Sequence, residues 1–113
     1  MSIDDLLKEL QQEYIQGIPE KIQELKEFSQ KNDLENLINS FHKLKGSGKT
    51  YGLEEVSIFG QFFEIWMRDK KEKVLPFMPK AIEILERINA SRIQGKPYSL
   101  DTDQEYQKLL SLK

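Results

Sequence analysis

The segment around the only histidine of the chain combines residue types that suit phosphoryl chemistry. His42 is followed by Lys45 and Gly46 one helical turn later and by Lys49 two turns later. An imidazole is partly neutral near pH 7, and its unprotonated nitrogen is then a nucleophile for phosphorus. A lysine supplies positive charge for phosphate oxygens, and an exposed glycine leaves room for a partner. This spacing predicts a phosphoryl site at His42.

The basic character of this segment is local. Between Asn36 and Leu53 the only charged side chains are Lys43, Lys45 and Lys49, whereas the 113-residue chain has a net charge of −2. An acidic balance argues against a nucleic-acid-binding or anionic-membrane-binding protein. We therefore expect any electrostatic partner to be met locally, at this patch.

The elements that must position His42 are helices. Apolar residues recur at helical spacing in five segments, near residues 3–16, 18–31, 34–50, 53–67 and 76–92, with no strand-like alternation. A charged turn is expected from Arg68 to Lys73. In the third segment Leu37, Phe41 and Leu44 face inward, which places His42 at the edge of the core stripe and predicts a partly exposed ring. An all-α, antiparallel bundle with short loops is the natural architecture.

Two regions of the chain are less regular. Residues 1–93 are predicted to form the bundle domain, and residues 94–113 a C-terminal extension that is either a linker or a short helix capped by Asp101 or Asp103. The fourth segment is rich in aromatic residues, which we assign mainly to the core, with Phe62 the most exposed of them. A partly exposed aromatic ring there would suit a docking surface.

The motif from His42 to Ser47, followed by Gly52 and Leu53, resembles the signature of histidine-containing phosphotransfer (HPt) domains. The resemblance continues through a group on the next helix and covers about residues 3–92. That group is Val56, Gly60, Gln61, Phe63 and Glu64. It implies a four-helix antiparallel bundle, with an additional N-terminal helix and an exposed histidine on a central helix.

The resemblance also implies roles for single residues. His42 matches the phosphorylated histidine, Lys45 the lysine that steadies the phosphoryl group, and Gly46 the small residue that gives a partner access. Glu64 matches the position that hydrogen-bonds the imidazole; if it accepts the Nδ1 proton, Nε2 is the attacking nitrogen. The expected docking residues besides Gly46 are Lys43, Lys49, Gln61 and Gly60, and Gly60 could also let the two central helices come close. Lys49 departs from the family, where a small residue is common.

The function implied by the resemblance is a passive relay. His42 would accept a phosphoryl group from the aspartyl phosphate of a receiver domain and pass it to another receiver. The receiver would supply Mg²⁺ and most of the catalysis, so this chain needs no metal or cofactor of its own. A glutamate at position 64 is similar to the phosphotransfer domains of chemotaxis-type kinases, in which a kinase domain phosphorylates the histidine directly. A histidine kinase as direct donor therefore stays open. We expect a cytoplasmic monomer.

Two alternatives remain beside the relay. One is an HPt-like adaptor that docks receivers or kinases without being phosphorylated. The other is an independent enzyme, which the residue inventory disfavours: the chain has no cysteine, no second histidine and no glycine-rich phosphate loop, and its adjacent acids look like helix-start residues. No apolar run is long enough to span a membrane, and no signal peptide is evident.

Overall fold

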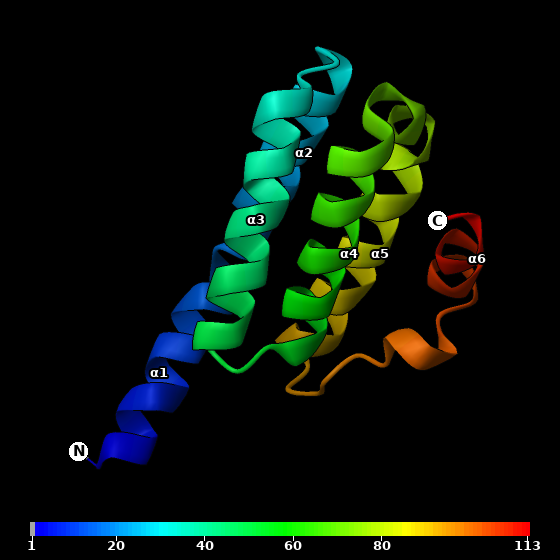
Figure 1. Cartoon of the computed structure of the whole chain (residues 1–113). Helices are drawn as coiled ribbons and strands as arrows, with labels where there is room; N and C mark the ends of the chain where they lie inside the picture. The colour runs from blue at the N-terminus through cyan, green and yellow to red at the C-terminus, as the bar shows by residue number, and fades with distance from the viewer. Residues whose placement is uncertain (1) are drawn as a thin grey trace.

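The computed structural model describes residues 2–113 and is built of helices (Figure 1). The α-helices are α1 (Ile3–Gln16), α2 (Ile18–Gln30), α3 (Leu34–Thr50), α4 (Glu54–Lys70), α5 (Met78–Ile93) and α6 (Gln104–Leu112). Two 3₁₀ segments, η1 (Lys71–Phe77) and η2 (Leu100–Thr102), join the last three helices. Helices α2 to α5 form the bundle, α1 precedes it and α6 lies against its side (Figure 1). This architecture confirms the predicted all-α bundle with an extra N-terminal helix.

Local sequence signals set most helix ends. Ser2 and Asp5 cap α1 reciprocally, and the Asp33 and Asp103 carboxylates accept the backbone N–H groups of the first turns of α3 and α6. Gly52 has a φ of +77°, a left-handed conformation that suits glycine in the turn between α3 and α4. The expected charged turn is corrected: α4 continues through Arg68 to Lys70, and η1 follows.

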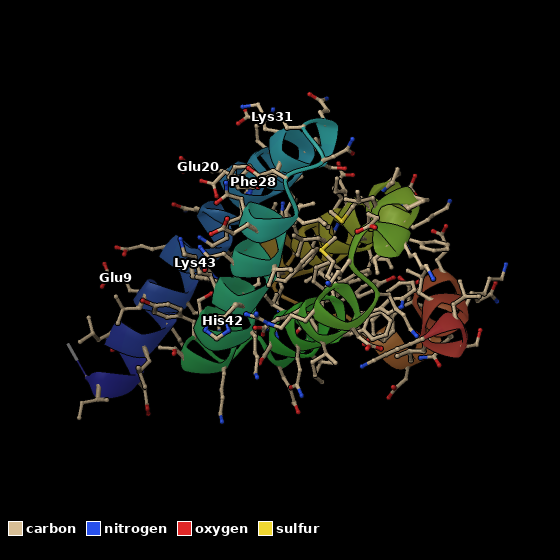
Figure 2. All side chains as sticks on the ribbon, turned by 45° about the horizontal axis from the view of Figure 1, so that its top comes forward. Glu9, Glu20, Phe28, Lys31, His42 and Lys43 are labelled. Carbon is tan, nitrogen blue, oxygen red and sulfur yellow. The ribbon has the colours of Figure 1, made fainter. Side chains whose placement is uncertain are left out.

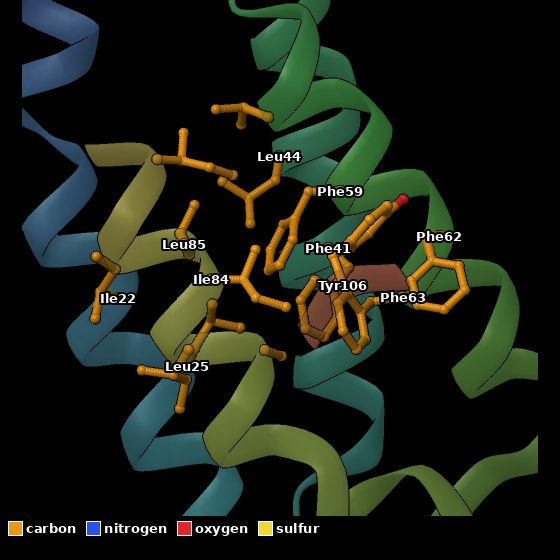
Figure 3. Close-up of a cluster of buried hydrophobic side chains, with 14 of the residues drawn as sticks. Ile22, Leu25, Phe41, Leu44, Phe59, Phe62, Phe63, Ile84, Leu85 and Tyr106 are labelled. Atoms are coloured by element: carbon orange, nitrogen blue, oxygen red, sulfur yellow. The ribbon is translucent and has the colours of Figure 1, made fainter. Parts of the chain in front are cut away.

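Aromatic side chains of α3 and α4 form the centre of the core (Figure 3). The Phe41 and Phe63 rings stack with centroids 5.1 Å apart, and Phe59 lies 5.0 Å from Phe63. Phe62, expected to be the most exposed aromatic residue of this helix, is instead buried, because the Tyr106 ring of α6 packs edge-on against it at 5.4 Å. The short C-terminal helix therefore covers a core position that the helical period alone leaves at the surface.

The C-terminal segment is held to the bundle at two ion pairs whose carboxylates are buried. Arg92 of α5 binds both carboxylate oxygens of Glu55 on α4, at 2.8 and 2.7 Å, and the backbone N–H of Tyr98 donates to the same carboxylate. Arg87 binds Asp103 in the same bidentate way. Both carboxylates are buried. A bidentate pair of this kind fixes the orientation of the guanidinium relative to the carboxylate.

The first two turns of α1 project beyond the bundle. Figure 1 shows α1 and α2 as one nearly continuous rod, of which α1 is the free end. The apolar stripe Ile3, Leu6, Leu7 and Leu10 is exposed, and burial begins only at Tyr14. Helical spacing thus predicted the helix, but the stripe has no covering surface in residues 2–113. Within those residues no helix is both long and apolar enough to cross a membrane.

Helices α3 and α4 cross closely because glycines stand at their contact. A Cβ added at Gly60 would lie 2.6 Å from the backbone nitrogen of Lys45 and 2.7 Å from the carbonyl oxygen of Phe41. A Cβ added at Gly48 of α3 would likewise lie 2.6 Å from the backbone nitrogen of Ser57 on α4. The two glycines set the separation at which a residue on α3 can reach one on α4.

Substituting Gly60 with alanine should therefore lower the free energy of unfolding. The added methyl group meets backbone atoms that cannot rotate away, and overpacking of this kind costs about 1–3 kcal/mol. Chemical denaturation measures the change. The matched control is Gly46→Ala, because a Cβ at Gly46 has no neighbour within 4 Å. Equal effects of the two substitutions would contradict the close-crossing explanation.

Candidate functional site

His42 lies on the face of α3 that borders α4 (Figure 2). Its side chain is 61% exposed, and its Nδ1 atom lies 3.0 Å from Oε2 of Glu64 on α4. The close helix crossing brings these two residues together although 22 positions separate them. The ring is thus open to a partner on one side and held by a carboxylate on the other.

The Glu64 carboxylate is almost wholly buried and is shared by two donors. Its side chain is 9% exposed, and Oε2 accepts from Arg68 Nε at 3.1 Å and Nη2 at 3.0 Å as well as facing His42. Burial alone would raise the pKa of Glu64, but the hydrogen bonds from Arg68 and His42 outweigh it and hold that pKa below its ordinary value. Glu64 is therefore an ionised acceptor near neutral pH.

An ionised carboxylate at Nδ1 decides which ring nitrogen is free. A carboxylate can only accept hydrogen bonds, so a neutral imidazole facing it carries its proton on Nδ1. The Nε2 atom then holds the unshared electron pair. The geometry favours the tautomer in which Nε2 is unprotonated.

The predicted lysines and glycines lie in different places around the ring. Lys45 is half-buried one turn after His42, and Gly46 beside it is exposed. Lys49 faces Gln61 across a depression between α3 and α4. Lys43, in contrast, lines a cleft of about 330 Å³ between α2 and α3, on the other flank of the helix. None of the three lysines forms an ion pair with an acid of residues 2–113.

Gly60 does not lie on the docking surface where it was expected. It is buried in the α3–α4 crossing, against the backbone of Phe41 and Lys45. A partner cannot touch it without separating the helices. Its contribution to the site is the helix separation that lets Glu64 reach His42.

Sequence reasoning missed Arg68 and two exposed isoleucines. Arg68 follows Glu64 by four positions, the spacing of side chains that meet on a helix, and this was the available signal. It was hidden by the assignment of Arg68 to a turn. Ile58 and Ile65 of α4 are 46% and 42% exposed. They stand one turn before and one turn after Gln61, so the two isoleucines are two turns apart. Exposed apolar residues on a core helix are visible only once the packing is known.

A shallow depression adjoins His42 on the side of Arg68. It has a volume of about 590 Å³, and its wall includes Asn39 and Glu35 of α3. No group of three or more histidine, cysteine, aspartate or glutamate side chains in residues 2–113 is arranged to hold a metal ion. The groups that the structure brings together here are an exposed imidazole, a buried carboxylate and the Arg68 guanidinium.

Comparison with models of known families matches residues 9–96 to the family described as the Hpt domain. The match covers all of α2 to α5 and most of α1, including His42, Glu64 and Arg68. The comparisons with curated proteins and with solved structures gave no match.

Proposed function

The chain belongs to the HPt domain family, whose members are phosphoryl carriers of two-component relays, and we propose that it carries the phosphoryl group on Nε2 of His42. The observation that carries the assignment of the atom is the 3.0 Å contact between His42 Nδ1 and Glu64. It leaves the opposite nitrogen free on a side chain that is 61% exposed. The donor and acceptor are receiver domains in this proposal.

The transfer step follows from this arrangement. The Nε2 electron pair attacks the phosphorus of the receiver's aspartyl phosphate, the N–P bond forms, and the P–O bond to the aspartate breaks. The bonding electrons leave with the aspartate, which becomes an ionised carboxylate. The ring retains its Nδ1 proton and acquires positive charge, which the Glu64 carboxylate stabilises. The reverse step returns the phosphoryl group to a second receiver, with Mg²⁺ supplied by that partner.

The surface around His42 suits a protein partner of this kind. Ile58 and Ile65 provide exposed apolar area on α4, and Gln61 stands between them. Lys45 and Lys49 supply positive charge on the α3 side. An apolar centre with a charged rim is the usual composition of a transient interface, and the lysines complement the acidic phosphorylation site of a receiver.

Incubation with a receiver domain that carries an aspartyl phosphate tests the proposal directly. The phosphoryl group should move to the chain and be recovered as an acid-labile, alkali-stable phosphate. Receivers should be profiled at short reaction times, because the physiological partner is the one that transfers fastest. Failure of every receiver, and of a histidine kinase, to label the chain would contradict the proposed function.

Gly46→Ala should separate stability from transfer. Alanine in place of a helical glycine stabilises a helix by roughly 1 kcal/mol, and the new methyl group meets nothing within the chain. If Gly46 gives the receiver access to His42, the same methyl group should slow transfer by about threefold to tenfold through loss of contact. Denaturation and rapid-quench transfer assays measure the two effects. Undiminished transfer would remove Gly46 from the docking surface.

A further inference from the structure

Arg68 is linked to His42 through Glu64 and forms no hydrogen bond with the ring itself. Its guanidinium donates through Nε and Nη2 to Oε2 of Glu64, the same oxygen that faces His42 Nδ1. Two donors that converge on one oxygen hold the position of that oxygen better than one donor can. The orientation of the Glu64 carboxylate is therefore set jointly by Arg68 and His42.

The charge of Arg68 matters as much as its geometry. An unbalanced carboxylate beside an imidazole favours the protonated ring, and a protonated ring has no electron pair with which to attack phosphorus. The guanidinium lies on the carboxylate at ion-pair distance and offsets part of its charge. Glu64 can then orient the Nδ1 proton with less tendency to hold a second proton on the ring.

The other charged groups near the ring do not perform this task. On α3, Lys43 follows His42 directly, Lys45 stands one turn away and Glu35 lines the same depression, and none of them forms an ion pair with Glu64 or with His42. From α2, Lys21 and Glu24 line only the cleft on the opposite flank of α3. Among residues 2–113 the cation that contacts the Glu64 carboxylate, other than the ring itself, is Arg68.

We propose that Arg68 is a positioning residue for phosphoryl transfer, which holds the Glu64 carboxylate on Nδ1 of His42 and offsets its charge so that the ring meets the receiver neutral with Nε2 outward. This inference rests on the proposed function. The proposed function by itself assigns no role to Arg68. The inference makes Glu64 and Arg68 one unit, whose removal in two steps should not have additive effects.

The direct readout is the imidazole itself. Because His42 is the only histidine, a long-range ¹H–¹⁵N spectrum of the untagged chain contains one imidazole, and its nitrogen shifts report tautomer and protonation. In the wild-type chain the neutral ring should be the Nδ1–H tautomer. In Arg68→Leu this preference should weaken, because the Glu64 carboxylate is no longer held on Nδ1.

Transfer from a phosphorylated receiver gives the second readout. Arg68→Leu should slow transfer at pH 7 by about threefold to tenfold. Arg68→Lys should restore the rate only in part, since lysine keeps the charge but not the paired donors. Lys70→Leu is the matched control. Lys70 is a similarly exposed cation at the end of α4, and its ion pair is with Asp69 rather than with Glu64. This variant should behave as wild type.

The cycle with Glu64→Gln completes the test. In that background the carboxylate charge is gone, and Arg68→Leu should not change the transfer rate by more than about twofold. If Arg68→Leu leaves the tautomer and the transfer rate unchanged in the wild-type background, the inference is overturned. A wild-type chain that accepts no phosphoryl group from any donor would instead overturn the proposed function, and the spectrum would still report on the Arg68 contact.

Discussion

Replacing His42 with glutamine will abolish acceptance of the phosphoryl group while leaving the fold intact. The glutamine amide is not a nucleophile, because its nitrogen electron pair is delocalised into the carbonyl group. The chain contains no second histidine and no cysteine that could take over. The side chain is 61% exposed and outside the core, so substitution there should change stability by less than about 1 kcal/mol. The measurement is transfer of label from a phosphorylated receiver, followed by acid and alkali treatment of the product.

Two outcomes of this experiment carry different meanings. Labelled phosphate that persists in His42→Gln with wild-type kinetics would refute the carrier assignment. Loss of label accompanied by full signalling in cells would favour the adaptor reading, in which docking suffices. In that case substitutions at Lys43 or Lys49 should abolish signalling although His42→Ala does not. Circular dichroism and thermal unfolding of each variant establish that the fold is retained.

The pairing of His42 with Glu64 illustrates how far sequence reasoning extends. The helical period placed His42 at the edge of a core stripe, and the family resemblance named Glu64 as its partner. The distance between them depends on the separation of α3 and α4, which Gly60 and Gly48 set through contacts with backbone atoms. A single sequence does not reveal which backbone a glycine faces. Gly60 was therefore given two roles: the one at a docking surface is wrong, and the close approach of the two helices is confirmed.

The errors at Phe62 and Arg68 have different origins. Phe62 is buried because α6 returns to α4 and sets Tyr106 against it, a long-range contact that no local period encodes. Arg68 was assigned to a turn because charged residues follow it, yet α4 continues for two further residues. Helix ends are decided by caps and packing as well as by composition. The roles proposed for Lys45, Gly46, Lys49 and Gln61 remain predictions until transfer is measured.

Arg92→Met should destabilise the protein more than any other single change considered. Arg92 is the cation of a bidentate pair with Glu55, whose side chain is only 6% exposed. Methionine keeps much of the apolar stem but leaves a buried carboxylate with the Tyr98 N–H as its remaining partner. Breaking a buried ion pair by removing one member costs about 3–5 kcal/mol. Urea denaturation at pH 7 measures this loss.

The pH dependence of that loss tests its electrostatic origin. Burial alone would raise the pKa of Glu55, but the hydrogen bonds from Arg92 and from the Tyr98 backbone outweigh it and hold the pKa below its ordinary value. A carboxyl group with a lowered folded-state pKa contributes stability above its unfolded-state pKa and loses it as the pH falls through the folded value. Without Arg92 the sign reverses, because burial then raises the pKa of Glu55 and protonation relieves the unpaired charge.

The deficit of Arg92→Met should therefore be largest near pH 7 and should narrow toward about pH 4, where the variant's Glu55 becomes neutral first. Glu55→Gln combined with Arg92→Met should recover at least half of the lost stability at pH 7, since glutamine still accepts the Tyr98 N–H without a charge. A deficit that stays constant between pH 7 and pH 4, with no recovery in the double variant, would show that lost packing of the arginine stem is the cause. In that case the ion pair would serve to orient residues 94–113 rather than to stabilise them.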